Sequence, residues 1–481
     1  MSSYSVAQNT SFLTIASIGQ KIISGVYFFI VSWFIAEGKT EIYFATFAAI
    51  AIFTVVADFG LGSTFTREIA QKPEKTVHYV HVIFALKLML GIGTVGLLFL
   101  SSILFKYPSQ NLFLILVAGL TLFSDSIRNI FYGVLRVKNN LKYESYGTVA
   151  AQFLSLLIGS IALILHADLI WLVVPFLIAS ALHTFYAMWC MYRHTQISFA
   201  WEWDGAIIKT FLLLSLPFAI SGIFAQLYSY QDSIIIKHFL PSIDGDNWAR
   251  AYKAAFAFQF IPTSLVATLY PRISALYVKK DETLQRLVLG SYRYLLLISV
   301  PLAFGTAAFI QPFFERFADR FIGAAPILEI LIFSVIFSYS NYIHFNVLNA
   351  THHQVVQTLL IGGALVFSVI ANILVIPRWG TSGAAFIAVM SSVLVAIFGY
   401  MYTKHIISFS HKAFFKQLVQ IVIPGSALYV VGKFLVMRGH LLEGVAVGGL
   451  VYIVAVFVTG GLKISMLKNS LQKIGYSKSL L

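Results

Sequence analysis

The chain has little charge. Only 11% of its 481 residues are Asp, Glu, Lys or Arg, whereas a soluble domain carries about 25%. Hydrophobic residues make up 59%, and the mean hydropathy is +0.84. The uncharged residues gather in runs that can cross a hydrocarbon core of about 30 Å, which needs roughly 20 helical residues. Since helices crossing a bilayer satisfy their own backbone hydrogen bonds, the sequence predicts an all-α, polytopic membrane protein.

Cysteine and nucleotide-binding motifs are also scarce. Cys190 is the single cysteine, which excludes an intramolecular disulfide and a thiolate metal site. No G-x-x-x-x-G-K-[ST] sequence occurs, so an ATP-driven pump is not supported. Neither a basic n-region nor a small-residue cleavage site precedes the first apolar run, which we expect to be a retained helix. We also find no carboxylate pair beside a long loop, and we expect a non-enzyme without a cofactor or metal.

Fourteen apolar segments follow one another along the chain. They lie at about residues 10–36, 42–66, 77–105, 111–135, 143–166, 169–192, 211–239, 248–272, 288–311, 324–350, 355–377, 381–403, 415–437 and 443–464. With a cytoplasmic N-terminus, the inside loops hold about twice as many Lys and Arg residues as the outside loops, so both termini are expected in the cytoplasm. This bias also explains the net charge of +14 without nucleic-acid binding.

The two halves of the chain show weak internal similarity. The stretch that opens Phe131-Tyr132-Gly133-Val134-Leu135 aligns with the one that opens Phe345-Asn346-Val347-Leu348. Parallel repeats are a common transporter plan, in which the substrate site lies between the halves. We therefore predict an N-terminal six-helix lobe, a C-terminal six-helix lobe, and two additional helices with a cytoplasmic tail, at residues 1–209, 210–410 and 411–481.

Charged residues within the apolar segments are concentrated in the first half. A charge at mid-bilayer costs at least about 2.5–3.5 kcal/mol, so those that remain usually face a bundle interior or a wet cavity. Lys21 lies near the centre of the first segment and has no acidic residue three or four positions away. Asp125, Arg128, Tyr132 and Arg136 share one helical face. The spacing leaves open whether Asp125 and Arg128 act on a ligand or only neutralise each other.

The second half offers amides and phenols instead. Arginine and lysine bind phosphate by charge-assisted hydrogen bonds, and amides and tyrosines suit sugar hydroxyl groups. The predicted substrate-binding residues are Lys21, Arg128, Tyr132, Arg136, Gln226, Tyr230, Tyr342 and Asn346. Carboxylates that could couple transport to an H⁺ or Na⁺ gradient are Asp58, Asp125 and Asp232.

Three stretches resemble a known family. The sequence Asp58-Phe59-Gly60-Leu61-Gly62-Ser63-Thr64-Phe65-Thr66-Arg67-Glu68-Ile69-Ala70 resembles the second-helix signature of polysaccharide flippases of the O-antigen type. These flippases belong to the multidrug/oligosaccharidyl-lipid/polysaccharide exporter superfamily. Residues 232–236 with 269–274, and 326–331 with 348–351, resemble the helix seven to eight and helix ten regions of that family.

The resemblance implies two six-helix lobes around a central cavity that work by alternating access. It implies a polyprenyl-diphosphate-linked oligosaccharide as cargo, carried across a bacterial cytoplasmic (inner) membrane for cell-surface polysaccharide assembly. Lys21, Arg128 and Arg136 would hold the diphosphate and sugar, and the partners would be the lipid bilayer, a polysaccharide polymerase and chain-length proteins. The additional helix pair is similar to that of the lipid II flippase, so lipid II is an alternative cargo. A cation-coupled multidrug exporter is a second alternative, although the basic excess favours an anionic cargo.

Overall fold

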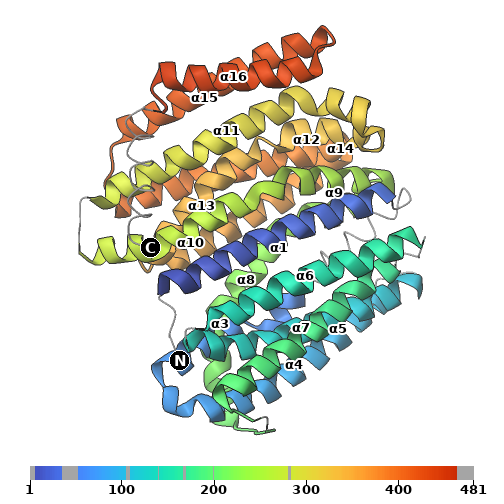
Figure 1. The fold of residues 1–481 in the computed structure, drawn as a ribbon, viewed down its shortest axis with the longest axis vertical. Coiled ribbons are helices and arrows are strands. Elements are labelled where there is room, and N and C mark those ends of the chain that lie inside the picture. Colours follow the sequence, from blue (N-terminus) through green and yellow to red (C-terminus); the bar gives the residue numbers. More distant parts are fainter. Residues whose placement is uncertain are drawn as a thin grey trace. The chain divides into compact units, whose positions relative to one another are not determined.

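The computed structural model describes residues 6–34, 53–104, 109–138, 140–165, 170–198, 200–279 and 283–462. All regular elements among these residues are α- or 3₁₀-helices, as Figure 1 shows. The chain divides into two compact units, Met1–Ala249 and Arg250–Leu481. They are the first unit and the second unit.

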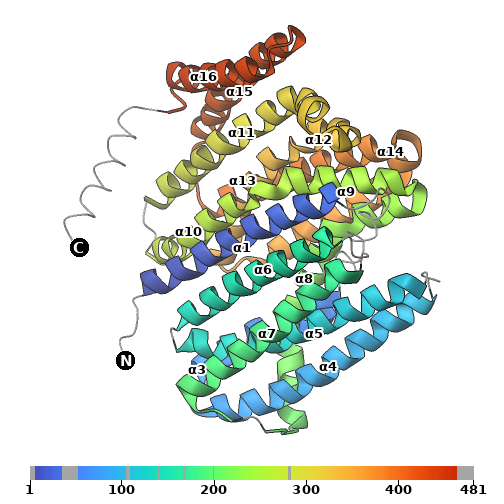
Figure 2. The same ribbon diagram turned by 45° about the vertical axis from the view of Figure 1, so that its right-hand side comes forward.

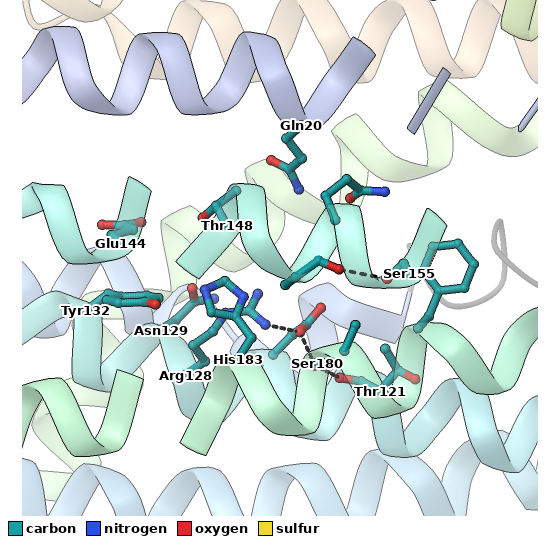
Figure 3. Close-up of a pocket in the computed structure, with 15 residues that line it drawn as sticks. Gln20, Thr121, Arg128, Asn129, Tyr132, Glu144, Thr148, Ser155, Ser180 and His183 are labelled. Atoms are coloured by element: carbon teal, nitrogen blue, oxygen red, sulfur yellow. Dashed lines mark hydrogen bonds and ion pairs between the residues drawn. The ribbon is translucent and has the colours of Figure 1, made fainter. Parts of the chain in front are cut away.

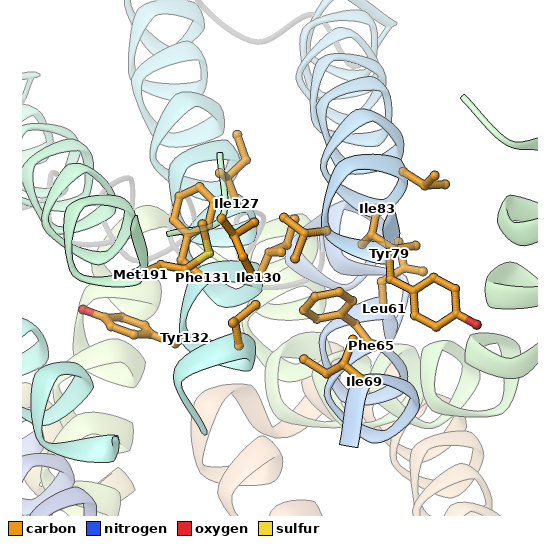
Figure 4. Packing of buried hydrophobic residues seen from close by; sticks show 14 of the residues in the cluster. Leu61, Phe65, Ile69, Tyr79, Ile83, Ile127, Ile130, Phe131, Tyr132 and Met191 are labelled. Atoms are coloured by element: carbon orange, nitrogen blue, oxygen red, sulfur yellow. The ribbon is translucent and has the colours of Figure 1, made fainter. Parts of the chain in front are cut away.

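The first unit is a bundle of long helices. Its elements are α1 (Val6–Phe34), α3 (Leu61–Gln71), the 3₁₀-helix Pro73–Lys75, α4 (Thr76–Leu104), α5 (Ser109–Val137), α6 (Leu141–Ile164), α7 (Ile170–Thr195) and α8 (Gly205–Phe239). The helix α1 packs on α6, while α7 packs on both α5 and α6. Side chains from α3, α4, α5 and α7 form an apolar core, of which Figure 4 shows Phe65, Ile83, Phe131 and Met191.

Gly60 explains part of the second-helix signature. Its φ of 70° lies in the left-handed region, which glycine adopts without a steric penalty. A Cβ at this position would also lie 2.7 Å from Phe218 Cβ and 2.9 Å from the carbonyl oxygen of Ser215. The glycine therefore lets α3 begin in close contact with α8.

The second unit contains the remaining helices. They are α10 (Phe260–Val278), α11 (Thr283–Phe317), the 3₁₀-helix Asp319–Ala324, α12 (Ala325–Leu331), α13 (Ser334–Ala350), α14 (Gln354–Ile406), α15 (His411–Met437) and α16 (Leu441–Thr459). The helix α9 (Ser242–Phe256) crosses the boundary between the units and leads through the 3₁₀-helix Ala257–Gln259 to α10. The helices α15 and α16 run side by side in Figures 1 and 2, and both contact α11.

The all-helical membrane fold is confirmed. Ten helices among the described residues are long and apolar enough to cross a membrane. An eleventh candidate is Asp319–Leu331, which comprises a 3₁₀-helix and α12, together with α13 after a bend of 52°. The helix α14 contains two of the predicted segments, separated at Gly380, where φ is 60° and ψ is −149°. The predicted segment 248–272 is divided by a 3₁₀-helix, and much of segment 42–66 lies outside the described residues. The total of fourteen stays a prediction.

The predicted lobe boundaries also stay a prediction. The expected division between residues 209 and 210 falls inside α8, which packs on α3 and α4 within the first unit. The two additional helices predicted from residue 411 onward correspond to α15 and α16, whereas residues 463–481 lie outside the described part of the chain.

Candidate substrate pocket in the first unit

A polar pocket of about 270 Å³ lies among α1, α5, α6 and α7, and Figure 3 shows its lining. The lining residues are Gln20 on α1; Thr121, Asp125, Arg128, Asn129 and Tyr132 on α5; Glu144, Thr148, Ala151, Gln152 and Ser155 on α6; and Phe176, Ala179, Ser180 and His183 on α7. On α5, α6 and α7 these residues recur every three or four positions, which places them on one face of each helix. Each otherwise apolar helix therefore contributes a polar stripe to the same cavity.

Asp125 is the centre of one hydrogen-bond network in this pocket. Its Oδ1 atom accepts hydrogen bonds from Arg128 Nη1 and from the Ser180 hydroxyl. The Ser180 Oγ atom also lies 3.3 Å from the carbonyl oxygen of Thr121. The carboxylate therefore joins α5 to α7, and its charge is balanced by Arg128.

Arg136 forms a second ion pair beside the pocket. Its Nε atom donates to Glu144 Oε2 over 2.8 Å, and its Nη2 atom donates to Glu144 Oε1. Such a two-point contact fixes the guanidinium and carboxylate in one plane. The ion pair of Arg136 with Glu144 therefore links α5 to α6. Arg136 is not among the residues that line the pocket.

Three buried polar atoms of the lining have no hydrogen-bond partner among the described residues: Tyr132 Oη, His183 Nε2 and Gln152 Nε2. Tyr132 is only 2% exposed and His183 only 6%. Leaving a buried polar group unsatisfied typically costs about 1–3 kcal/mol. Such groups in a native structure call for an explanation, and a ligand that supplies the missing partners is one.

Gly147 shapes this corner of the pocket. A Cβ at residue 147 would lie 2.4 Å from Tyr132 Oη and 2.5 Å from His183 Nε2. The absence of a side chain on α6 therefore lets the polar tips of Tyr132 and His183 lie together against that helix. The two rings are tilted, with their centroids 5.5 Å apart.

The pocket brings together three of the predicted residues, Asp125, Arg128 and Tyr132. Lys21 is adjacent in sequence to Gln20, but its side chain is exposed and lies outside the lining. Within the described ranges Lys21 makes no ion pair.

Asp58 instead forms an ion pair with a buried lysine. Its Oδ1 atom lies 2.6 Å from Lys87 Nζ, and Lys87 is fully buried. The same Nζ atom donates to the carbonyl oxygen of Ser126 over 2.9 Å. The Ser126 hydroxyl in turn lies 3.2 Å from the carbonyl oxygen of Ala57. This network ties α4 and α5 to the segment that precedes α3.

The remaining predicted residues lie elsewhere, and their roles stay predictions. Gln226, Tyr230 and Asp232 are on α8, where buried Asp232 accepts a hydrogen bond from the Gln231 side chain. Tyr342 and Asn346 are on α13 in the second unit. The Nδ2 atom of buried Asn346 donates to the carbonyl oxygen of Val266 on α10 over 2.9 Å.

Sequence reasoning missed several residues of the lining. His183 and Gln152 carry unpartnered polar atoms, and Asn129 and Glu144 complete the polar wall. A signal for His183 exists, because Phe176, Ser180 and His183 follow one helical face. Glu144 gave no such signal, since its partner Arg136 belongs to the preceding helix.

Comparison with known proteins identifies the family. Residues 6–277, more than half of the chain, match the family described as polysaccharide biosynthesis protein. An uncharacterised membrane protein of Methanocaldococcus jannaschii is 30% identical over 164 residues, a stretch that covers 34% of this chain and 32% of that protein. The chain thus matches about a third of the length of this relative.

Solved structures show the same fold. The lipid II flippase MurJ in an inward closed conformation has a TM-score of 0.74 at 15% identity, covering 92% of this chain and 97% of that chain. A mutant of the MATE transporter VcmN of Vibrio cholerae has a TM-score of 0.61 at 15% identity, covering 85% and 98%. A MOP superfamily transporter of Pyrococcus furiosus has a TM-score of 0.59 at 15% identity, covering 83% and 95%. The chain therefore belongs to the polysaccharide biosynthesis protein family and has the fold of MurJ and the MATE transporters.

Proposed function

We propose that the protein is a flippase that carries polyprenyl-diphosphate-linked oligosaccharide across the cytoplasmic membrane by alternating access, for cell-surface polysaccharide assembly. The observation that carries this proposal is the polar pocket with three unpartnered buried polar atoms inside a membrane helix bundle. A hydrophilic head group cannot cross hydrocarbon unless its hydrogen bonds are replaced. The match to the polysaccharide biosynthesis protein family supports a glycan cargo.

Lys21 is the residue that we assign to the diphosphate. Its ammonium group has no ion-pair partner among the described residues, and its side chain is exposed. By contrast, Arg128 is paired with Asp125, and Arg136 with Glu144. Arg128 still has donors beyond the one bound to Asp125, and we assign these to hydroxyl groups of the sugar.

Asp125 is the carboxylate that we assign to ion coupling. It lines the pocket and its side chain is 36% exposed. Asp58 is held by the fully buried Lys87, and Asp232 is itself buried. A proton on Asp125 would free Arg128 from its partner, so that protonation and cargo binding would affect the same pair of side chains.

Reconstituted vesicles that contain polyprenyl-diphosphate oligosaccharide test this function. We expect protein-dependent exposure of the sugar at the opposite leaflet. Lys21→Ala and Arg128→Ala should abolish it while the protein stays in the membrane. Lys209→Ala removes an exposed lysine of α8 and serves as the matched control with wild-type activity. Wild-type transport by Lys21→Ala and Arg128→Ala would overturn the assignment of these residues.

A lipid II flippase is the second candidate. The observation that favours it is the α15–α16 pair, which packs on α11 in the second unit, together with the fold shared with MurJ. Lipid II in the same vesicles separates the two cargoes. Proton-linked movement of a small organic cation, without movement of either lipid, would instead indicate a multidrug exporter.

A further inference from the structure

We infer that the pocket of the first unit binds a neutral, hydroxylated group, namely one sugar ring of the cargo, through Tyr132, Gln152 and His183. This inference rests on the proposed function and specifies which part of the cargo enters the pocket. It separates the contacts to the sugar from the contact of Lys21 with the diphosphate.

Charge compensation argues against an anionic ligand in this pocket. Asp125 is paired with Arg128, and Glu144 with Arg136. Within the described lining no charged side chain is left without an opposite charge. A diphosphate would place several negative charges near the carboxylates of Asp125 and Glu144, and like charges at short range repel each other. It would also have to draw a guanidinium from its carboxylate, since Arg128 is bound to Asp125 and Arg136 to Glu144.

The unpartnered atoms match the chemistry of hydroxyl groups. The Gln152 Nε2 atom donates, the Tyr132 hydroxyl donates and accepts, and the His183 Nε2 atom does one or the other depending on its tautomer. A sugar hydroxyl both donates and accepts, so it can satisfy all three. An ionised phosphate only accepts, so it has nothing to donate to Asp125 or Glu144. Phe176 and Ala179 supply an apolar wall for the C–H face of a ring.

The size of the pocket limits what enters it. Its volume of about 270 Å³ lies below the 300–1,000 Å³ that is typical of sites for drug-sized ligands. One ring with its hydroxyl groups fits this space better than a whole oligosaccharide. The pocket would bind one sugar ring at a time, while the rest of the cargo stays outside it.

Tyr132→Phe tests the inference because it should weaken ligand binding without lowering the stability of the protein. The Tyr132 hydroxyl has no partner among the described residues, so its removal costs no protein hydrogen bond and should leave the melting temperature unchanged or higher. Tyr27→Phe is the matched control in the same unit. Tyr27 is only 1% exposed, and its hydroxyl donates to the carbonyl oxygen of Leu172 over 3.2 Å. The control should melt at a lower temperature and bind ligand normally.

The probes are methyl glucoside and N-acetylglucosamine, with sodium pyrophosphate as the anionic comparison, added to the purified full-length protein in nanodiscs. We expect at least one saccharide to raise the melting temperature of the wild type and of Tyr27→Phe. Tyr132→Phe and Gln152→Leu should each weaken saccharide binding by roughly five- to tenfold, the effect of one hydrogen bond. Saccharide binding that is absent from the wild type, or unchanged in both variants, would overturn the inference. So would pyrophosphate binding that depends on Tyr132.

Transport by the same variants separates this inference from the proposed function. If the wild type flips the lipid-linked oligosaccharide and both Tyr132→Phe and Gln152→Leu flip it equally fast, the sugar subsite is wrong and the flippase stands. If the wild type binds saccharides through Tyr132 but flips no lipid, the subsite stands and the proposed function fails.

Discussion

The two units stabilise their polar interiors in different ways. The first unit uses ion pairs: Lys87 with Asp58 between α4 and the segment before α3, and Arg136 with Glu144 between α5 and α6. These contacts hold elements together through charges, which are costly to desolvate and which a proton or a ligand can redistribute.

In the second unit neutral groups join several helices, although Lys433 on α15 also lies 3.9 Å from Glu329 on α12. The Tyr292 hydroxyl on α11 lies 2.8 Å from His344 Nδ1 on α13, and the same nitrogen lies 3.0 Å from the Thr403 hydroxyl on α14. The Tyr339 hydroxyl donates to the carbonyl oxygen of Phe258 over 2.7 Å. The closest ion pairs among the described residues therefore lie in the first unit, whereas these contacts of the second unit are made by neutral groups.

The largest effect should come from the buried lysine. Asp58→Asn leaves Lys87, which is fully buried, without a carboxylate, and the free energy of unfolding should fall by about 3–5 kcal/mol. Denaturation of the purified protein measures this loss. The double variant Asp58→Asn/Lys87→Met removes both charges and should recover most of the stability. A single variant as stable as the wild type would show that this pair does not hold the unit together.

A smaller effect is expected in the second unit. His344→Phe leaves the buried hydroxyls of Tyr292 and Thr403 without this partner, at a cost of about 1–3 kcal/mol. Because neutral groups make these contacts, transport by the variant should keep the pH dependence of the wild type. A changed pH profile of transport would contradict the structural role and would indicate that His344 takes part in ion coupling.

The smallest effect concerns the linker between α7 and α8. Glu202 Oε2 lies 2.9 Å from His78 Nδ1 and 3.4 Å from His81 Nδ1, and Asp204 Oδ2 lies 3.5 Å from His78 Nε2. The hydrogen bond from His78 lowers the pKa of Glu202 below its ordinary value of 4.5. A carboxylate with a lowered pKa stabilises the folded state above its unfolded pKa, and this contribution is lost as the pH falls through the folded pKa.

Hydrogen exchange of residues 200–204 measures this attachment. The protection of these amides, measured as the exchange rate relative to the intrinsic rate at the same pH, should be lower at pH 3.5 than at pH 7. Glu202→Gln should bring the protection at pH 7 close to the acidic value. Glu315→Gln on α11, which removes an exposed carboxylate of the second unit, is the control. The shift should be small because both His78 and Glu202 are exposed. Equal linker exchange by the wild type and Glu202→Gln at pH 7 would show that the contact contributes nothing.

Sequence reasoning predicted the helical fold because long apolar runs satisfy their backbone only as helices. The shared face of Asp125, Arg128 and Tyr132 followed from helical spacing, and all three line the pocket. Lys21 does not line the pocket. Successive residues of a helix point about 100° apart, and Gln20 is the residue of α1 that faces the pocket. The rotation of α1 about its axis depends on its packing against α6, which no local pattern reveals.

Contacts between residues of separate helices could not be predicted from the sequence either. Lys87 lies 29 residues from Asp58, and neither the spacing nor the composition of the two segments links them. The pocket also depends on Gly147, whose missing side chain admits the tips of Tyr132 and His183. Such a close approach is a property of the packed bundle, so the sequence alone gave no reason to single out this glycine.

The most direct test of the flippase assignment compares two lipids in the same reconstituted vesicles. One is polyprenyl diphosphate that carries an oligosaccharide, and the other is the same carrier without sugar. A membrane-impermeant chemical label reports how much of each lipid reaches the opposite leaflet. We predict protein-dependent movement of the sugar-bearing lipid at a clearly higher rate than that of the bare carrier. Movement of neither lipid, with accumulation of an organic cation in the same vesicles, would contradict the account.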